Sequence, residues 1–310
     1  MIGTARRRVK RVCDMLGRGV KKREEIMPML RCVALAGAVL GLFLVVRADR
    51  AVAQDEVARE IVQVAGDLYR FRNNNHYTVF LVTPDGIIAT DPINAEAATW
   101  LKQRLRERFG VPVKYLIYSH EHADHVSGGE VFADTATVVA HENAKAHIAA
   151  CGAATAMPQI TFADRMTLEL GGKMVELTYL GRNHSDSMIV MGFPAARAMF
   201  VVDIVGVDRM PYRDLPGAHL QGWIAALDRL SEMDFDILVP GHGSMGVRAD
   251  VAAHRRYFED LRDVVRGELA AGKSLDEVKA AATMDAYKDW LQYDAWQQLN
   301  VEGMVRILRE

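Results

Sequence analysis

The segment 120–125, with the sequence HEHADH, carries three imidazoles and two carboxylates within six residues. It directly follows residues 113–118, whose apolar and β-prone side chains predict a buried strand. A strand end holds a side chain rigidly, while the loop that leaves it is free to fold around an ion. The alternative is a polar loop in which histidines cluster by chance, but random spacing seldom gives this density of ligands. The segment therefore predicts a metal site.

The spacing within this segment predicts two cations rather than one. His120 and His122 are two residues apart, so in extended chain they point to the same side and can bind one ion. Asp124 and His125 follow where the chain turns, and they can face a second ion beside the first. Imidazole and carboxylate ligands without a thiolate suit zinc, iron or manganese better than a purely structural zinc site.

Three later strand ends carry side chains of the same kind. His184 follows a predicted β-hairpin over 161–180 and is a natural third imidazole for the first cation. Asp203 ends an apolar strand, where a carboxylate is costly unless it is paired or bound to metal. Asp203 can therefore bridge the two cations. His242 lies between two glycines after another apolar strand, and glycines let the backbone approach a ligand closely.

The elements that position these residues can be followed in the hydrophobic pattern. Three strands, a helix capped by Asn94 and the strand before the histidine-rich segment come first, and further helices and a helical C-terminal part come later. This order predicts sheets with helices packed outside them. The expected strands are at 62–71, 77–82, 87–91, 113–118, 138–140, 188–192, 198–203 and 237–239. The expected helices are at 94–109, 128–132, 141–150, 220–233 and beyond 247.

The other five histidines receive no metal-binding role. His76 ends a polar loop between two strands, where it can overhang the site and touch substrate, but a solvated loop histidine is the favoured interpretation. His141 and His147 are six residues apart and do not share a helical face well, so we interpret both as structural or surface residues. His219 and His254 lie at or on predicted helices and are given no role.

The ordered set of motifs resembles the metallo-β-lactamase-fold hydrolase superfamily over about residues 60–250. His-x-His-x-Asp-His at 120–125 is followed by a histidine, an aspartate and Pro-Gly-His-Gly at 240–243, and Thr90-Asp91-Pro92 is similar to an early strand end of that family. The resemblance implies an α+β fold, an αβ/βα four-layer sandwich, with the site at one edge of two packed sheets. Its motifs are specific for the fold and the metal centre and poorly specific for substrate.

The resemblance also implies a ligand set. By that resemblance the first metal is held by His120, His122 and His184, the second by Asp124, His125 and His242, and Asp203 lies between the two. An aspartate at position 203 is more like the Asp-bridged general hydrolases, such as glyoxalase II and lactonases, than like the β-lactamases proper.

The expected function is that of a binuclear zinc-dependent hydrolase. Two cations about 3.5–4 Å apart share a water and lower its pKa, and the resulting hydroxide attacks the carbonyl of a β-lactam, lactone or thioester. Asp124 is the expected catalytic residue, because it can orient the nucleophile. We expect two Zn²⁺ per chain, with iron or manganese as alternative metals. The competing hypotheses are an iron-dependent redox or sulfur dioxygenase-type enzyme, a phosphoesterase, and a binding protein without catalysis.

Composition and charge bear on the partner. The chain has 310 residues, half of them hydrophobic, and a formal net charge of −2, so no global field attracts nucleic acid. A small-molecule substrate is the expected partner. Arg182, Arg209 and Tyr212 are candidates for binding an anionic substrate, although solvated loop residues remain the simpler interpretation. The oligomeric state stays open.

The N-terminal segment differs in kind from the rest of the chain. Basic residues precede an apolar run over 32–46, and Ala51-Val52-Ala53 then provides a small-x-small cleavage signature. This pattern predicts a secretory signal peptide over 1–53, a hydrolase domain with C-terminal helices over 54–310, and a periplasmic or secreted protein. The alternative is an uncleaved anchor that attaches the protein to a membrane. Met1, Met27 and Met29 are the candidate start sites.

Overall fold

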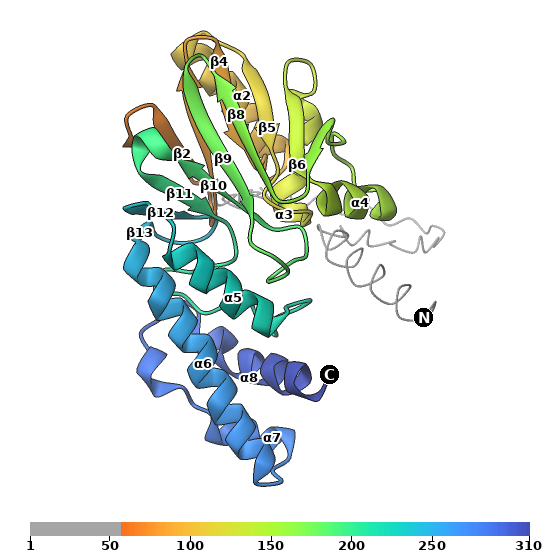
Figure 1. Cartoon of the computed structure of the whole chain (residues 1–310), viewed down its shortest axis with the longest axis vertical. Coiled ribbons are helices and arrows are strands. Elements are labelled where there is room, and N and C mark those ends of the chain that lie inside the picture. The colour runs from red at the N-terminus through yellow and green to blue at the C-terminus, as the bar shows by residue number, and fades with distance from the viewer. Residues whose placement is uncertain (1–56) are drawn as a thin grey trace, which may run out of the picture.

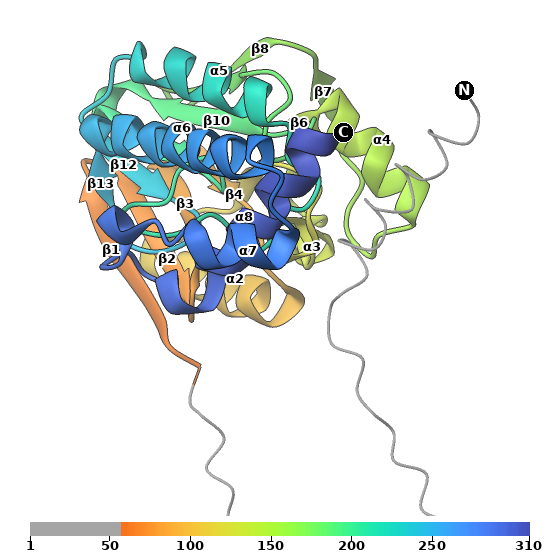
Figure 2. The same cartoon turned by 90° about the horizontal axis from the view of Figure 1, so that it is seen from below.

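Two β-sheets face each other in the computed structural model, which describes residues 57–310. Helices cover the outer face of each sheet, and the C-terminal helices lie at one end of the domain (Figures 1 and 2). The predicted signal peptide lies outside the described residues and stays a prediction. Within 57–310, no helix is both long enough and apolar enough to cross a membrane.

The first sheet contains seven strands in sequence order. Its first four strands are antiparallel, and the pairs from the fourth strand to the seventh are parallel. A parallel pair needs a crossover connection, and the first such crossover is helix α2. The strands are β1 (Arg59–Ala65), β2 (Leu68–Asn73), β3 (His76–Thr83), β4 (Gly86–Thr90), β5 (Val113–Ile117), β6 (Thr137–His141) and β7 (Ile160–Phe162).

The second sheet contains six strands in the order β13-β12-β11-β10-β9-β8. All its pairs are antiparallel except β11–β12, and helix α5 forms the crossover between those two strands. The strands are β8 (Arg165–Leu170), β9 (Lys173–Tyr179), β10 (Ile189–Phe193), β11 (Ala198–Val201), β12 (Ile237–Pro240) and β13 (Gly246–Val247).

Helix ends agree with the capping signals in the sequence. The Asn94 side chain accepts a hydrogen bond of 2.9 Å from the Ala97 amide at the start of α2, and Gly110 ends that helix with a φ of 70°. The α-helices are α2 (Ala95–Phe109), α3 (Ala123–Val126), α4 (Glu142–Cys151), α5 (Leu220–Ser231), α6 (Arg248–Ala270), α7 (Leu275–Ala281) and α8 (Tyr293–Arg309), and short 3₁₀ turns occupy Gly129–Phe132, Pro194–Ala196 and Asp285–Tyr287.

The core is divided by the first sheet. One cluster of buried side chains fills the space between the sheets, with Ile117 from β5 and Met191 from β10, and continues to Trp223 of α5 and Phe258 of α6. The other cluster lies on the far side of the first sheet, where α2 buries Leu101. Helix, sheet, sheet and helix therefore form four layers, which confirms the predicted α+β sandwich.

Two predicted elements are wrong in detail. The single strand expected at 62–71 is a hairpin of β1 and β2, because Gly66 takes a φ of 52° and turns the chain. The hairpin expected at 161–180 begins with β7, which pairs with β6 in the first sheet, so only β8 and β9 form the hairpin. Alternation along the sequence does not reveal to which sheet a short strand belongs.

Candidate metal centre

The histidine-rich segment lies where β5 ends, as its sequence predicts. The first two imidazoles belong to the loop after the strand, and α3 carries Asp124 and His125. His120, His122 and His125 are buried, whereas the Asp124 side chain is 47% exposed and opens towards a cavity. The segment thus buries its imidazoles and leaves one carboxylate accessible to a small molecule.

The residues predicted for the first metal form one group. The Nε2 atom of His184 lies 3.1 Å from Nδ1 of His122. Oδ2 of Asp203 lies 3.6 Å from Nε2 of His184 and 3.6 Å from Nε2 of His120. One donor atom from each of these four residues lies within 4.8 Å of all the others.

The residues predicted for the second metal form a neighbouring group. Nε2 of His125 lies 3.5 Å from Oδ2 of Asp124 and 3.4 Å from Oδ2 of Asp203. Nε2 of His242 lies 3.7 Å from Oδ2 of Asp124 and 3.2 Å from Oδ1 of Asp203. All seven predicted site residues therefore converge, and Asp203 faces both groups.

The donor set fits divalent cations. Two donors about 2.0–2.1 Å from one tetrahedral ion lie about 3.3–3.4 Å apart, and the separations above run from 3.1 to 3.7 Å. The Nε2 atoms of His120 and His125 are buried without a hydrogen-bond partner among the described residues. Buried polar atoms without partners are costly, and an ion between these side chains would satisfy them.

The electrostatics of the group also suit metal binding. Burial, reinforced by neighbouring imidazoles, places the pKa of His120 well below its usual value. Burial also lowers the pKa of His184 to about 4, although Asp203 opposes the shift. Both imidazoles are therefore neutral at pH 7, which is the form that binds metal. Burial opposes ionisation of Asp203, but His242 and His125 outweigh it and hold the pKa of that carboxyl well below its usual range.

The backbone at Asp203 is held in an uncommon conformation. Asp203 has a φ of 49°, in the left-handed region, which costs about 1–3 kcal/mol for a residue other than glycine. The conformation comes directly after β11 and turns the carboxylate towards both groups of imidazoles. Such strain persists where the surrounding structure requires it, and here it accompanies the bridging position.

A buried carboxylate, Asp91, supports imidazoles of both groups. His125 donates through Nδ1 to Oδ2 of Asp91 over 3.1 Å, which leaves Nε2 for a metal. Ser119 donates from its amide and its hydroxyl to Asp91, over 2.7 and 2.6 Å, and its hydroxyl oxygen lies 3.0 Å from Nδ1 of His120. Asp91 is not among the site residues predicted from the sequence. The sequence signal that could have identified Asp91 is a carboxylate at the end of a buried strand, the same signal that identified Asp203.

Glu121 supports the turn that carries His184. The carboxylate is buried and accepts hydrogen bonds of 2.9 and 2.8 Å from the Ser185 hydroxyl and one from the Ser187 hydroxyl. Burial opposes ionisation, but His122 and Ser187 outweigh it and lower the pKa of Glu121. The histidine-rich segment therefore anchors the neighbouring turn that completes the first group.

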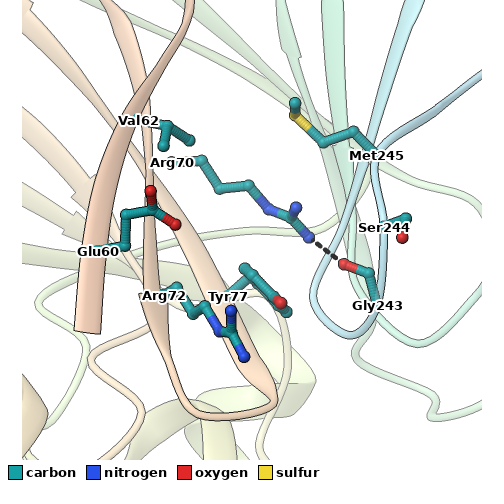
Figure 3. A pocket seen from close by; sticks show the side chains of 8 residues that line it. All are labelled: Glu60, Val62, Arg70, Arg72, Tyr77, Gly243, Ser244 and Met245. Carbon is teal, nitrogen blue, oxygen red and sulfur yellow. Dashed lines mark hydrogen bonds between the residues drawn. The ribbon is translucent and has the colours of Figure 1, made fainter. Parts of the chain in front are cut away.

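Arg70 of β2 fixes the turn that carries His242. Its guanidinium donates to the Gly243 carbonyl over 2.6 Å and lies 3.6 Å from the centre of the Tyr77 ring (Figure 3). It also donates to the Pro240 carbonyl over 3.2 Å. Burial lowers the pKa of Arg70 to about 10, so it remains a cation at neutral pH. A Cβ atom at Gly241 would lie 2.8 Å from Val202, which explains the glycine there.

The structure corrects the interpretation of His76. Rather than a solvated loop residue, it lies at the candidate metal centre, with Nε2 3.3 Å from Oδ2 of Asp124. Its ring meets that of His242 edge to face at 4.8 Å between centroids. The position of His76 in a polar loop does not predict its contacts with Asp124 and His242, because these depend on where the β2–β3 hairpin meets the second sheet.

The other four histidines have structural contacts. His141 and His219 accept from backbone amides at the starts of α4 and α5. His147 lies 2.6 Å from Asp186, and His254 is buried beside Phe258. His254 also lies in the wall of the cavity described next.

A cavity of about 700 Å³ opens above the candidate metal centre. Its lining includes Asp124 and His76 of the candidate metal centre, and Arg209, Tyr212 and Trp296 form another part of its wall. Arg182, the third residue considered for substrate binding, is not among the residues that line it. The volume suits a small molecule.

Comparison with known proteins agrees with this geometry. Residues 92–242 match the model of the metallo-beta-lactamase superfamily. Subunit alpha of the 2,4-dinitroanisole O-demethylase of Nocardioides sp. (strain JS1661) is 27% identical over 231 residues, which cover 73% of this chain and 67% of the relative. Metallo-beta-lactamase type 2 of Bacteroides fragilis is 24% identical over 176 residues, covering 56% of this chain and 67% of the relative.

Two solved structures are similar in fold. A metallo-beta-lactamase from Pontibacter korlensis superposes with a TM-score of 0.59 at 21% identity, over 65% of this chain and 99% of the other. A metallo beta lactamase from Hirschia baltica superposes with a TM-score of 0.58 at 16% identity, over 64% of this chain and 97% of the other. From the matched family model, the shared sandwich and the clustered histidine and aspartate side chains, we conclude that residues 92–242 form a metallo-beta-lactamase superfamily domain and that the protein is a metal-dependent hydrolase.

Proposed function

We propose that this enzyme binds two zinc ions and hydrolyses a carbonyl centre in a small molecule, with β-lactams, lactones and thioesters as the substrate classes. The observation that carries the proposal is the position of Asp203. Its Oδ1 atom lies 3.2 Å from Nε2 of His242 in the second group, and its Oδ2 atom lies between the groups, 3.6 Å from Nε2 of His120 and 3.4 Å from Nε2 of His125. A carboxylate so placed suits a bridge between two cations.

Metal ions bound there would lower the pKa of a shared water towards neutrality and polarise the bond under attack. The protein residues supply position and charge. Burial opposes ionisation of Asp124, but His125 and His76 outweigh it and hold the pKa of Asp124 far below its usual range. Asp124 is therefore ionised, and its exposed side can accept a hydrogen bond from the attacking water and orient it.

The cavity wall favours a substrate that has a flat apolar part and an anionic group. Tyr212 and Trp296 meet edge to face at 5.2 Å, and the Arg209 guanidinium lies 4.9 Å from the centre of the Trp296 ring. Asp203 is the carboxylate that acts electrostatically on Arg209, and its ion pairs among the described residues are with His120, His125, His184 and His242. Burial lowers the pKa of Arg209, with Asp203 opposing the shift, and a guanidinium remains charged at neutral pH. A substrate carboxylate would pair with this cation.

The test combines metal analysis with a substrate panel. Purified protein is assayed for zinc, iron and manganese, and for hydrolysis of nitrocefin, an acyl-homoserine lactone, a glutathione thioester and a phosphodiester. We expect two zinc ions per chain and turnover of at least one carbonyl substrate. Asp124→Ala and His184→Ala should abolish that turnover in folded protein, whereas Asp134→Ala, at a surface carboxylate paired with Lys102, should not. Wild-type rates in either site variant would refute the assigned roles.

A second candidate reaction is the hydrolysis of an activated aryl ether. Two observations favour it: the similar protein from Nocardioides is a subunit of a 2,4-dinitroanisole O-demethylase, and the aromatic rings of Tyr212 and Trp296 line the cavity. In that reaction water adds to the ring carbon that bears the methoxy group, and the bond from this carbon to the methoxy oxygen breaks. The methoxy group takes up a proton and leaves as methanol, and the ring keeps the oxygen of the water as a phenolate. Release of dinitrophenolate and methanol from 2,4-dinitroanisole would select this reaction over carbonyl hydrolysis.

We also propose that the protein is exported to the periplasm or secreted, with a small molecule rather than nucleic acid as its partner. The basic, apolar and small-x-small order of residues 1–53 and the net charge of −2 support this. N-terminal sequencing of protein from cell fractions tests it. A mature chain that begins near Gln54 would support cleavage, and an intact chain in the membrane fraction would indicate the anchor instead.

A further inference from the structure

His76 approaches the candidate metal centre from an element that carries none of the seven predicted ligands. It is the first residue of β3, at the tip of the β2–β3 hairpin, and lines the cavity. The His76 side chain is 32% exposed, and its Nε2 atom lies 3.3 Å from Oδ2 of Asp124. We propose that His76 is a further ligand of the second cation, an inference that rests on the proposed two-metal centre.

The distances at Asp124 carry this inference. The same carboxylate oxygen, Oδ2, lies 3.3 Å from Nε2 of His76, 3.5 Å from Nε2 of His125 and 3.7 Å from Nε2 of His242. Donors that share one cation lie at separations of about this size. His76, Asp124 and His242 also form a group in which the donor atoms all lie within 4.8 Å of one another. His76 is thus related to Asp124 in the same way as the two predicted imidazole ligands.

The hairpin tip is fixed against the turn that carries His242. His242 donates through Nδ1 to the Asn75 carbonyl over 3.0 Å, and the Tyr77 amide donates to the Gly241 carbonyl over 2.8 Å. These contacts flank His76 on both sides in the sequence. Asn74 turns the chain with a φ of 55°, and His76 pairs with Asn73 across the hairpin. His76 and His242 are therefore held together by backbone hydrogen bonds, which gives a metal ligand the fixed position it needs.

The two cation positions differ in their number of candidate protein donors. His76 forms one close group with Asp124 and His242, and His125 forms an overlapping group with Asp203 and His242, so the second cation has five candidate protein donors. Five protein donors exceed the four of a tetrahedral zinc site, so an ion there would be at least five-coordinate if all of them bind. The first group has three imidazoles and one shared carboxylate. The two positions should therefore differ in coordination number and in spectrum.

The test measures metal binding rather than turnover. Full-length wild-type protein, His76→Ala, His76→Gln and the control Ser127→Ala are titrated with Zn²⁺ in competition with a chromophoric chelator. Ser127 lines the same cavity and is not among the residues grouped as candidate ligands. Each protein is also loaded with Co²⁺, whose visible absorption reports the number and type of ligands. Thermal unfolding followed by circular dichroism checks that each variant is folded.

The expected result is a selective loss at the second position. Wild-type protein and Ser127→Ala should bind two ions alike, and both His76 variants should bind the second ion about tenfold more weakly or worse, because losing even a partner that only orients a ligand costs about 10–100-fold in affinity. The cobalt spectrum of both His76 variants should change at the second ion only.

Three outcomes would overturn the inference. His76→Ala that binds both ions with wild-type affinity and spectrum would exclude His76 as a ligand. His76→Gln that behaves as wild type while His76→Ala does not would mean that His76 only positions Asp124 through a hydrogen bond. Wild-type protein that binds fewer than two ions would remove the proposed centre itself, whereas wild-type protein that binds two ions and hydrolyses no substrate would count against the proposed function alone.

Discussion

Oδ2 of Asp91 lies 3.1 Å from Nδ1 of His125, behind the candidate metal centre, although 34 residues separate the two in sequence. The same carboxylate accepts two hydrogen bonds from Ser119, which in turn contacts His120. One buried carboxylate thus fixes the ring orientation of an imidazole in each of the two groups. Its removal should disturb both groups while leaving every candidate ligand in place.

Asp91→Asn should weaken metal binding by about 10–100-fold, because the amide cannot accept all three hydrogen bonds or hold the His125 tautomer. Asparagine tolerates the φ of 24° at this position, so the substitution should change the hydrogen bonds and leave the backbone conformation as it is. Chelator competition measures the effect. The control is Asp85→Asn in the exposed β3–β4 turn. Equal affinities in the two variants would show that Asp91 does not orient the ligands.

Arg70→Met should destabilise the fold by about 1–3 kcal/mol, because it leaves the carbonyls of Pro240 and Gly243 without their donor. It should also lower the affinity for the second metal ion, since the turn that carries His242 loses its anchor. Urea unfolding of the metal-free protein and metal titration measure the two effects. Arg72→Met, on the same hairpin, removes an exposed hydrogen bond and a contact of 5.9 Å with the centre of the Tyr77 ring, and should cost less than about 0.5 kcal/mol.

Glu121→Gln should lower stability by about 1–3 kcal/mol at pH 7, since the buried carboxylate accepts from two serine hydroxyls and an amide cannot accept from both equally. The pKa of Glu121 is lowered in the folded state, so its contribution is present above the unfolded pKa and is lost as pH falls through the folded pKa. The wild-type advantage over Glu121→Gln should therefore shrink in acid. An advantage that stays constant from pH 7 to pH 3 would contradict this account, and Glu142→Gln at an exposed site is the control.

His254 should make stability depend on pH between about 6.5 and 4. Burial lowers the pKa of His254 to about 4, so in this window the unfolded chain binds a proton that the folded chain does not. Stability therefore falls as pH drops from 6.5 to 4, by on the order of 3 kcal/mol for the full shift. In metal-free protein, His254→Gln should remove this part of the slope and leave the part due to other groups. Parallel stability curves for the two proteins would refute the assignment.

The sequence by itself determined the metal-binding chemistry and the strand ends that carry it. Four apolar runs end in His120 and its neighbours, His184, Asp203 and His242, because a buried strand requires apolar side chains along its length, so the polar ligands that follow it mark where the strand ends. The Asn94 cap of α2 was also readable, since capping acts within four residues. These signals are local, and the structure bears out their positions.

Only the tertiary structure decided what surrounds those residues. Asp91, Arg70 and His76 act across 34, 170 and 48 positions of sequence, on His125, on the Pro240 carbonyl and on Asp124 respectively. Periodicity reports which face of an element is buried, but it contains no information about which other element covers that face. The place where the β2–β3 hairpin meets the second sheet therefore fixes the support of the site, the shape of its cavity and the position of an eighth candidate ligand.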